Sequence, residues 1–241
     1  MFELILAATG TAVATGLGVI PVALMGARAE TLRPFLLAVS AGVMIVAAAL
    51  GLIRPALERG SLLQVGGGII LGVLFLFAAR RWIARGNRRA HRIDARGTSI
   101  LVFLVLFVHS LPEGFAVGTA YAEDPATIGI FVVLAIAIQN IPEGTSVAIP
   151  LAAEGVSTKR QVGAAILSSI PQPIGAVIAF LLVESITGLL PISFGFAAGA
   201  MLMLAAIELL PQSYRSGWRP ATAGLLLGMA VMGVLDLLLQ P

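Results

Sequence analysis

Long apolar runs of similar length divide this chain of 241 residues and restrict what it can fold into. A helix that crosses a hydrocarbon core of about 30 Å needs around 20 mostly apolar residues, and the runs between the charged or turn-rich breaks have about this length. They do not alternate polar and apolar residues, as the strands of a membrane barrel do. We therefore expect an all-α polytopic membrane protein with eight transmembrane helices, which lie near residues 4–26, 34–54, 61–83, 98–121, 126–150, 161–184, 189–211 and 220–240.

The composition excludes several classes of protein. Hydrophobic residues make up 59% of the chain and charged residues only 11%, whereas soluble domains are about 45–50% apolar and about 25% charged. Such a chain lacks the polar residues to cover a water-exposed surface, which argues against a soluble enzyme, a disordered protein and a nucleic-acid binder. The sequence contains no cysteine, so disulfides and thiolate metal sites are also excluded.

Basic residues are distributed unevenly among the predicted loops. Most lysines and arginines lie in the first, third, fifth and seventh loops, whereas the second loop holds only Arg54 and Arg59 and the fourth, with Glu123 and Asp124, has none. Because loops rich in Lys and Arg stay in the cytoplasm, the pattern predicts that both termini are extracytoplasmic. The short loops and the lack of a targeting segment favour the cytoplasmic membrane of a prokaryote.

The longest predicted loop, residues 84–97, is expected to be a basic cytoplasmic segment. It is rich in arginine and holds a single histidine, His91. We interpret it as a solvated linker that contacts lipid headgroups. A metal-sensing loop is the alternative, but the arginines around His91 would repel a cation.

Ionisable residues inside lipid cost roughly 2.5–3.5 kcal/mol each on insertion scales, and here they fall into matched segments. Residues 109–114 in the fourth run read His-Ser-Leu-Pro-Glu-Gly, and residues 139–144 in the fifth run read Gln-Asn-Ile-Pro-Glu-Gly. Residues 168–173 in the sixth run, Ser-Ser-Ile-Pro-Gln-Pro, are similar. A single His–Glu pair in a membrane can be a structural hydrogen bond, but two matched segments on consecutive helices favour a functional site.

The spacing within the first two segments predicts a cation site. His109 and Glu113 lie four residues apart, hence on one helix face, and so do Gln139 and Glu143. If these faces meet, an imidazole, two carboxylates and an amide oxygen converge near the bilayer midplane. Each proline frees a backbone carbonyl, and each glycine permits a close helix approach. This set of nitrogen and oxygen ligands suits Zn²⁺, Fe²⁺, Mn²⁺, Co²⁺, Ni²⁺ or Cd²⁺.

These segments resemble those of the ZIP (Zrt/Irt-like protein) family of divalent-metal transporters, in particular its bacterial GufA-type members. Weaker matches are residues 40–44, residues 198–201 and the segment from Glu208 to Pro211. The resemblance covers the whole chain and implies a single transmembrane transport domain over residues 1–241. It also implies a homodimer, and a 3+2+3 bundle in which the first three and last three helices are inverted repeats around the middle two.

The resemblance further implies a centre for two metal ions. Family members with a full second site carry Asn, Asp and Glu where this chain has one hydroxyl and two amides. The loss of two carboxylates predicts that the second site is weak or empty. The residues implied by position are His109, Glu113, Gln139 and Glu143 for the first site and, besides the two shared glutamates, Ser110, Asn140 and Gln172 for the second.

Three further residues are candidates for a transport pathway. Glu208, near the cytoplasmic end of the seventh run, is placed to receive the metal on its way out, although helix capping or pairing with Arg215 explains it equally well. Asp236, near the outer face, is a candidate for attracting cations at the entrance, or else a helix-end residue at the lipid interface. Met44 in the second run is the third candidate, and its residue type also suits packing.

We expect a transporter that moves divalent metal, with Zn²⁺ as the first candidate, through the lipid bilayer towards the cytoplasm by alternating access. No Gly-x-x-x-x-Gly-Lys phosphate-binding motif is present, so we expect no nucleotide as a partner. We also expect no enzyme activity, because an intramembrane metalloenzyme needs three ligands, an open water position and a general base. The alternatives are a metal-binding sensor or degenerate transporter without flux, which the altered second site suggests, and an intramembrane metalloenzyme. The sequence has no His-Glu-x-x-His motif and one histidine within a predicted span, which argues against the metalloenzyme.

Overall fold

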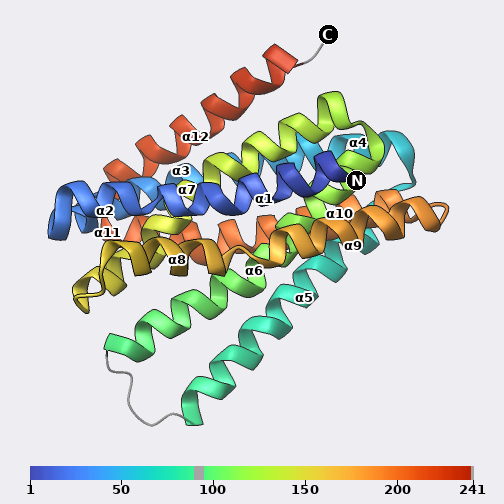
Figure 1. The fold of residues 1–241 in the computed structure, drawn as a ribbon. Coiled ribbons are helices and arrows are strands. Elements are labelled where there is room, and N and C mark those ends of the chain that lie inside the picture. The colour runs from blue at the N-terminus through green and yellow to red at the C-terminus, as the bar shows by residue number, and fades with distance from the viewer. Residues whose placement is uncertain (90–94, 240–241) are drawn as a thin grey trace.

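The computed structural model describes residues 1–89 and 95–239, apart from the side chains of residues 27, 84 and 86–102. The described residues form helices and contain no strand, which confirms the all-α prediction (Figure 1). Eight helical segments among them are long and apolar enough to cross a membrane, as expected for a multi-pass membrane protein. These spans are Phe2–Met25, Arg28–Arg59, Leu62–Ile83, Phe103–Glu123, Pro125–Ala153, Thr158–Ser185, Leu189–Ser216 and Trp218–Leu239.

Four of the spans consist of one long helix. The fifth span begins with a short π-helical turn, which Asp124 caps by accepting hydrogen bonds from the backbone N–H groups of Ala126 and Thr127 at 3.0 and 3.2 Å. Such a cap satisfies donors that the first turn of a helix leaves without partners. The elements are α5 (Leu62–Arg89), α6 (Ala95–Glu123), η3 (Pro125–Gly129) with α7 (Ile130–Ala153), and α12 (Trp218–Leu239).

The other four spans are interrupted. In the second and seventh spans a π-helical turn directly precedes the segment that contains Pro55 or Pro211. Proline cannot donate to the helix and its ring displaces an earlier carbonyl, so a wider turn accommodates it. The elements are α1 (Phe2–Leu17) and α2 (Val19–Met25); η1 (Gly26–Leu32), α3 (Arg33–Val46), η2 (Ala47–Ile53) and α4 (Arg54–Arg59); α8 (Thr158–Ser168) and α9 (Pro171–Ser185); and α10 (Leu189–Leu204), η4 (Ala205–Leu209) and α11 (Leu210–Ser216).

The basic segment expected to be a loop over residues 84–97 is helical at both of its ends. Helix α5 continues through Arg89, and α6 begins at Ala95. Arginine and alanine favour helices, and a polar helix that leaves the lipid is solvated by water, so the apolar boundary at residue 83 does not end the helix. His91 lies outside the described residues.

Both termini lie at one end of the molecule in Figure 1, opposite the end where α5 stops and α6 starts. The connections after the second, fourth and sixth spans meet at the end with the termini. There Arg59 forms an ion pair with Glu123 (Nη2–Oε1 2.5 Å), and the Gln64 amide donates to the Gly188 carbonyl at 3.5 Å. An even number of spans places these connections and both termini on the same side.

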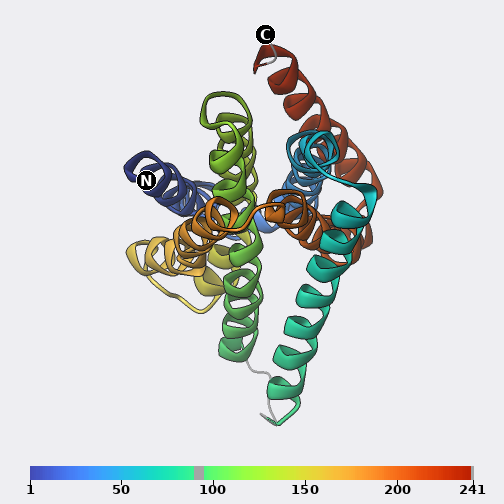
Figure 2. The same ribbon diagram turned by 90° about the vertical axis from the view of Figure 1, so that its right-hand side faces the viewer.

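Helices α6 and α7 lie in the middle of the bundle (Figure 2). On one side of them are α1, α8 and α9, and on the other are α3, α5, α10 and α12. The most extensive contacts join α5 to α10, α6 to α9, and α3 to α12. Two central helices with partners on both sides thus carry the matched polar segments through the interior of the protein.

Candidate metal centre

The two matched segments lie on α6 and α7, and both helices remain continuous through their prolines, Pro112 and Pro142. The glycine after each glutamate faces a backbone. A Cβ on Gly114 would collide with the Gln172 carbonyl on α9, and a Cβ on Gly144 would collide with the Thr15 carbonyl on α1. The glycines therefore bring α9 against α6 and α1 against α7 at the level of the glutamates, rather than α6 against α7.

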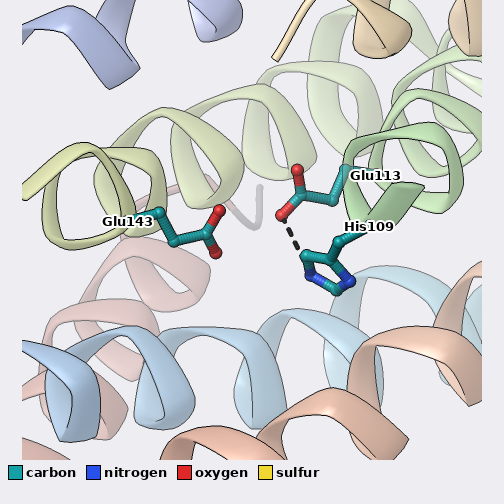
Figure 3. A group of neighbouring side chains, drawn as sticks. All are labelled: His109, Glu113 and Glu143. Carbon is teal, nitrogen blue, oxygen red and sulfur yellow. Dashed lines mark ion pairs between the residues drawn. The ribbon is translucent and has the colours of Figure 1, made fainter. Parts of the chain in front are cut away.

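His109, Glu113 and Glu143 form a buried cluster. Figure 3 shows the imidazole and the Glu113 carboxylate on one helix, with the Glu143 carboxylate directed towards them from another. One ligand atom of each residue lies within 4.8 Å of the others, and the Nε2 atom of His109 lies 3.6 Å from Oε1 of Glu113. The structure thus brings together the imidazole and the two carboxylates, whereas Gln139 presents its amide nitrogen, not its oxygen, to Glu113.

Several polar atoms of this cluster have no hydrogen-bond partner among the described residues. They are both ring nitrogens of His109, the Oε1 atom of Gln139 and the Oε1 atom of Glu143. The other end of the Gln139 amide donates to Oε1 of Glu113 at 2.5 Å. Buried polar atoms nearly always have a hydrogen-bond partner. A divalent cation would bind the free lone pairs of these nitrogen and oxygen atoms and so take the place of the missing partners. These four residues thus fit a metal ion.

The residues predicted for a second site behave differently. Asn140 and Gln172 are buried and adjacent, and the Gln172 amide donates to Oε2 of Glu113 at 2.5 Å. The Ser110 hydroxyl instead lies within hydrogen-bonding distance of the backbone carbonyls of Leu106 (2.9 Å) and Ser168 (3.0 Å). The structure therefore brings Gln172 to Glu113 and Asn140 to Gln172, whereas Ser110 bonds to backbone atoms.

Sequence reasoning missed Thr11 on α1, whose hydroxyl lies 2.9 Å from the Gln172 side-chain oxygen and 2.8 Å from the Ala8 carbonyl. Asn140 donates to the Thr11 carbonyl at 2.7 Å. A lone threonine in an apolar helix gives no signal that it faces a polar cluster. Only the packing of α1 against α7 and α9 brings it there.

A cavity of about 210 Å³ reaches the cluster at Glu143. Its lining includes Arg33, the first residue of α3, and Gln212 of α11, and Figure 1 shows α11 at the end of the bundle opposite the termini. Glu208 lines it too and pairs with Arg80 of α5 (Oε2–Nη1 3.2 Å), not with Arg215, the partner proposed from sequence. The remaining lining residues are Leu37, Val105, Leu106, Ser146, Leu204 and Leu209.

A second cavity, of about 140 Å³, lies at the end with the termini. Asp236, Arg54 and Glu58 contribute its charged groups. None of His109, Glu113 and Glu143 lines it, so it is separate from the cluster.

Met44, the third pathway candidate, is fully buried within the main hydrophobic core. One turn earlier on α3, the Ser40 hydroxyl lies 3.4 Å from the Gln139 carbonyl oxygen. Ser40 thus lies where α3 packs against α7, while Met44 belongs to the core.

Comparison with known proteins identifies relatives along most of the chain. Residues 83–236 match the family model described as ZIP Zinc transporter. The chain is 33% identical to the zinc transporter GufA of Myxococcus xanthus, over 93% of this chain and 94% of that protein. It is 31% identical to the zinc transporter ZIPB of Bordetella bronchiseptica, over 92% of this chain and 77% of that protein. It is also 43% identical to the zinc transporter ZupT of Corynebacterium glutamicum, over 62% of this chain and 57% of that protein. This chain belongs to the ZIP family.

Proposed function

We propose that the protein transports divalent metal ions, with Zn²⁺ as the first candidate, across the membrane towards the cytoplasm. The observation that carries this proposal is the buried His109, Glu113 and Glu143 cluster, which is open to a cavity at Glu143 and has unpaired nitrogen and oxygen atoms. Zinc binds such ligands readily, but so do Cd²⁺, Fe²⁺, Mn²⁺, Co²⁺ and Ni²⁺. The relatives named above are zinc transporters, which supports zinc first.

The orientation of the protein in the membrane follows from where the basic connections lie. The cavity leads from Glu143 towards the end of the bundle that carries most of the basic connections. Loops rich in Lys and Arg stay in the cytoplasm, so we assign this end to the cytoplasm and both termini to the outside. Glu208 lies on the way out, and Asp236 lies in the outer cavity. We expect the membrane to be the cytoplasmic membrane of a prokaryote, and dimerisation stays a prediction.

Recurring contacts support the 3+2+3 inverted-repeat arrangement. Gly18 on span one meets the Ile141 carbonyl of α7, and Gly175 on span six meets the Leu111 carbonyl of α6. Likewise, Gly42 of α3 approaches the Leu225 carbonyl of α12, while Gly199 of α10 approaches the Ile69 carbonyl of α5. Gly18 and Gly42 are separated along the sequence by the same number of residues as Gly175 and Gly199. Inverted repeats of this kind are how many transporters alternate access to a site near the membrane midplane.

The metal would bind at the first site, through the imidazole of His109, the amide oxygen of Gln139 and the two carboxylates. At the second site this chain offers amides in place of carboxylates, and Ser110 is engaged with backbone carbonyls. Two divalent ions would carry four positive charges against two carboxylates. We therefore propose one working site.

Uptake of zinc into proteoliposomes tests the proposal. We expect the wild type to accumulate zinc and Glu143→Ala to lose most of the flux, because that variant lacks the carboxylate that meets the cavity. Glu184→Ala is the matched control, since Glu184 is an exposed carboxylate at the end of α9 and its loss should leave flux unchanged.

Folding of each variant is checked by size-exclusion chromatography and thermal unfolding. The absence of flux of any divalent metal through correctly folded wild type would overturn the transport proposal and favour a metal-binding sensor. Equal flux in Glu143→Ala and wild type would show that the ion takes another route.

A further inference from the structure

The side-chain amide of Gln172 has a partner for every polar atom. Its nitrogen donates to Oε2 of Glu113 at 2.5 Å and to the side-chain oxygen of Asn140 at 3.2 Å. Its oxygen lies 3.1 Å from the Asn140 nitrogen and 2.9 Å from the Thr11 hydroxyl. The amide is fully buried, and these contacts come from three different spans. The orientation of the amide is therefore fixed, with its nitrogen towards Glu113.

This satisfied group contrasts with the atoms around His109. Within the part of the chain that the structure describes, unpaired polar atoms of the centre belong to His109, Gln139 and Glu143, and none belongs to Thr11, Asn140 or Gln172. A buried group with all its hydrogen bonds made gains little from a cation, whereas an unpaired one gains a partner. The two halves of the centre are thus chemically unequal.

The Gln172 side-chain nitrogen partly replaces a cation at Glu113, because its N–H group stabilises the negative charge of the carboxylate. A hydrogen bond from an N–H group to a carboxylate stabilises the negative charge and fixes the oxygen that accepts it. A metal ion bound at Oε2 of Glu113 would have to displace this N–H group, and the Gln172 amide could not turn its oxygen to the ion without losing its bonds to Thr11 and Asn140. The Gln139 amide also donates to Glu113, but its oxygen is unpaired, so it can turn that oxygen towards an ion at the first site.

We infer that the Gln172 amide, oriented by Thr11 and Asn140, occupies the place of a second cation beside Glu113, so that the centre holds one metal ion. Thr11 is then a positioning residue for Gln172. The inference rests on the proposed function, because it presumes that the first site binds metal.

Replacing one atom tests the first half of the inference. Gln172→Glu keeps the side-chain oxygen that faces Thr11 and Asn140, both of which can still donate to it, and puts an oxygen where the nitrogen faces Glu113. We expect the purified wild type to bind one Zn²⁺ per chain and Gln172→Glu to bind two, measured by equilibrium dialysis with elemental analysis. Two ions in the wild type, or one in a correctly folded Gln172→Glu, would overturn the inference.

A matched pair of variants tests the role of Thr11. Thr11→Val keeps the shape of the side chain but removes the hydroxyl, while Thr11→Ser keeps the hydroxyl. Loss of a hydrogen-bond partner of a metal ligand typically lowers metal affinity about 10–100-fold. Gln172 is such a partner of Glu113, and Thr11 acts only through Gln172, so we expect Thr11→Val to weaken zinc binding by at most this factor in isothermal titration calorimetry, and Thr11→Ser to restore it. Equal affinity in Thr11→Val and wild type, or equal loss in both variants, would contradict the positioning role.

The two proposals fail in distinguishable ways. If the folded wild type binds no zinc, the proposed function fails. If it binds and transports zinc while Gln172→Glu still binds a single ion, only the inference about Gln172 fails.

Discussion

At the scale of single residues, the carboxylates of the two glutamates of the centre differ in their hydrogen bonds. Glu113 accepts hydrogen bonds from two amides, those of Gln139 and Gln172, whereas Oε1 of Glu143 has no partner among the described residues and the residue lines the cavity. An ion that arrives through the cavity therefore meets Glu143 first. Glu113 joins the ligand set once the Gln139 amide turns its unpaired oxygen, in place of its nitrogen, towards the ion.

We expect Glu143→Gln to weaken zinc binding by more than the roughly 10–100-fold that loss of an outer hydrogen-bond partner costs. The variant keeps the size of the side chain but loses the charge that attracts the cation. Isothermal titration calorimetry with Zn²⁺ measures the change, and Glu184→Gln at the exposed end of α9 is the control. Unchanged affinity in Glu143→Gln would mean that Glu143 is not a ligand.

Zinc should also stabilise the folded protein. A ligand that binds only the folded state at 100 times its Kd adds about 2.7 kcal/mol to the free energy of unfolding. We expect added zinc to raise the Tm of the wild type, a chelator to reverse the rise, and His109→Ala to lose most of it. An equal rise in His109→Ala would place the stabilising ion elsewhere.

The sequence identified the residues whose arrangement a single helix determines. His109 and Glu113, like Gln139 and Glu143, share a face because of their spacing, and a matched motif on the next helix suggested that the faces meet. The sequence could not identify Thr11 or Arg80, because their contacts depend on how α1 and α5 pack against other helices. From the sequence, the nearby Arg215 is a candidate partner for Glu208. The packing of α5 against α10 instead places Arg80 within ion-pair distance of Glu208.

At the scale of helices, glycine sets how closely the central pair approaches its neighbours. Gly144 has the Thr15 carbonyl against it, and backbone atoms cannot move aside as a flexible side chain can. The sequence predicted a close approach at this glycine, but not that α1 is the partner, nor the π-helical turns before Pro55 and Pro211, since apolar runs alone do not show how a helix accommodates proline.

We expect Gly144→Ala to destabilise the protein by at least the 1–3 kcal/mol typical of an overpacked core, because α1 must move away from α7. Gly163→Ala on α8 is the control, since a Cβ there meets nothing within 4 Å. The comparison is made by thermal unfolding of both variants in detergent. A Tm for Gly144→Ala equal to that of Gly163→Ala would show that α1 and α7 are not held at this distance.

At the scale of the whole molecule, the two cavities described above lie at opposite ends, and of these two the one lined by Glu143 reaches the cluster. The cavity lined by Ser146 and Glu208 includes Glu143, while the one lined by Thr127 and Asp236 stops short of the centre. The cavity at Glu143 therefore leads towards the end that we assign to the cytoplasm. Transport would require the opposite arrangement in turn, with the outer cavity extended to the centre and the inner one closed.

Cysteine labelling can test this arrangement, because the chain contains no cysteine of its own. We expect a membrane-impermeant thiol reagent to modify Ser146→Cys faster in inside-out vesicles than in right-side-out vesicles, and zinc to slow the reaction by occupying the neighbouring Glu143. Thr127→Cys, in the outer cavity, is the matched control and should show the reverse preference. Faster modification of Ser146→Cys from the outside would mean either that the orientation is inverted or that the resting protein opens outwards. The Thr127→Cys result decides between these, since an inverted orientation reverses both preferences whereas an outward-open protein changes only that of Ser146→Cys.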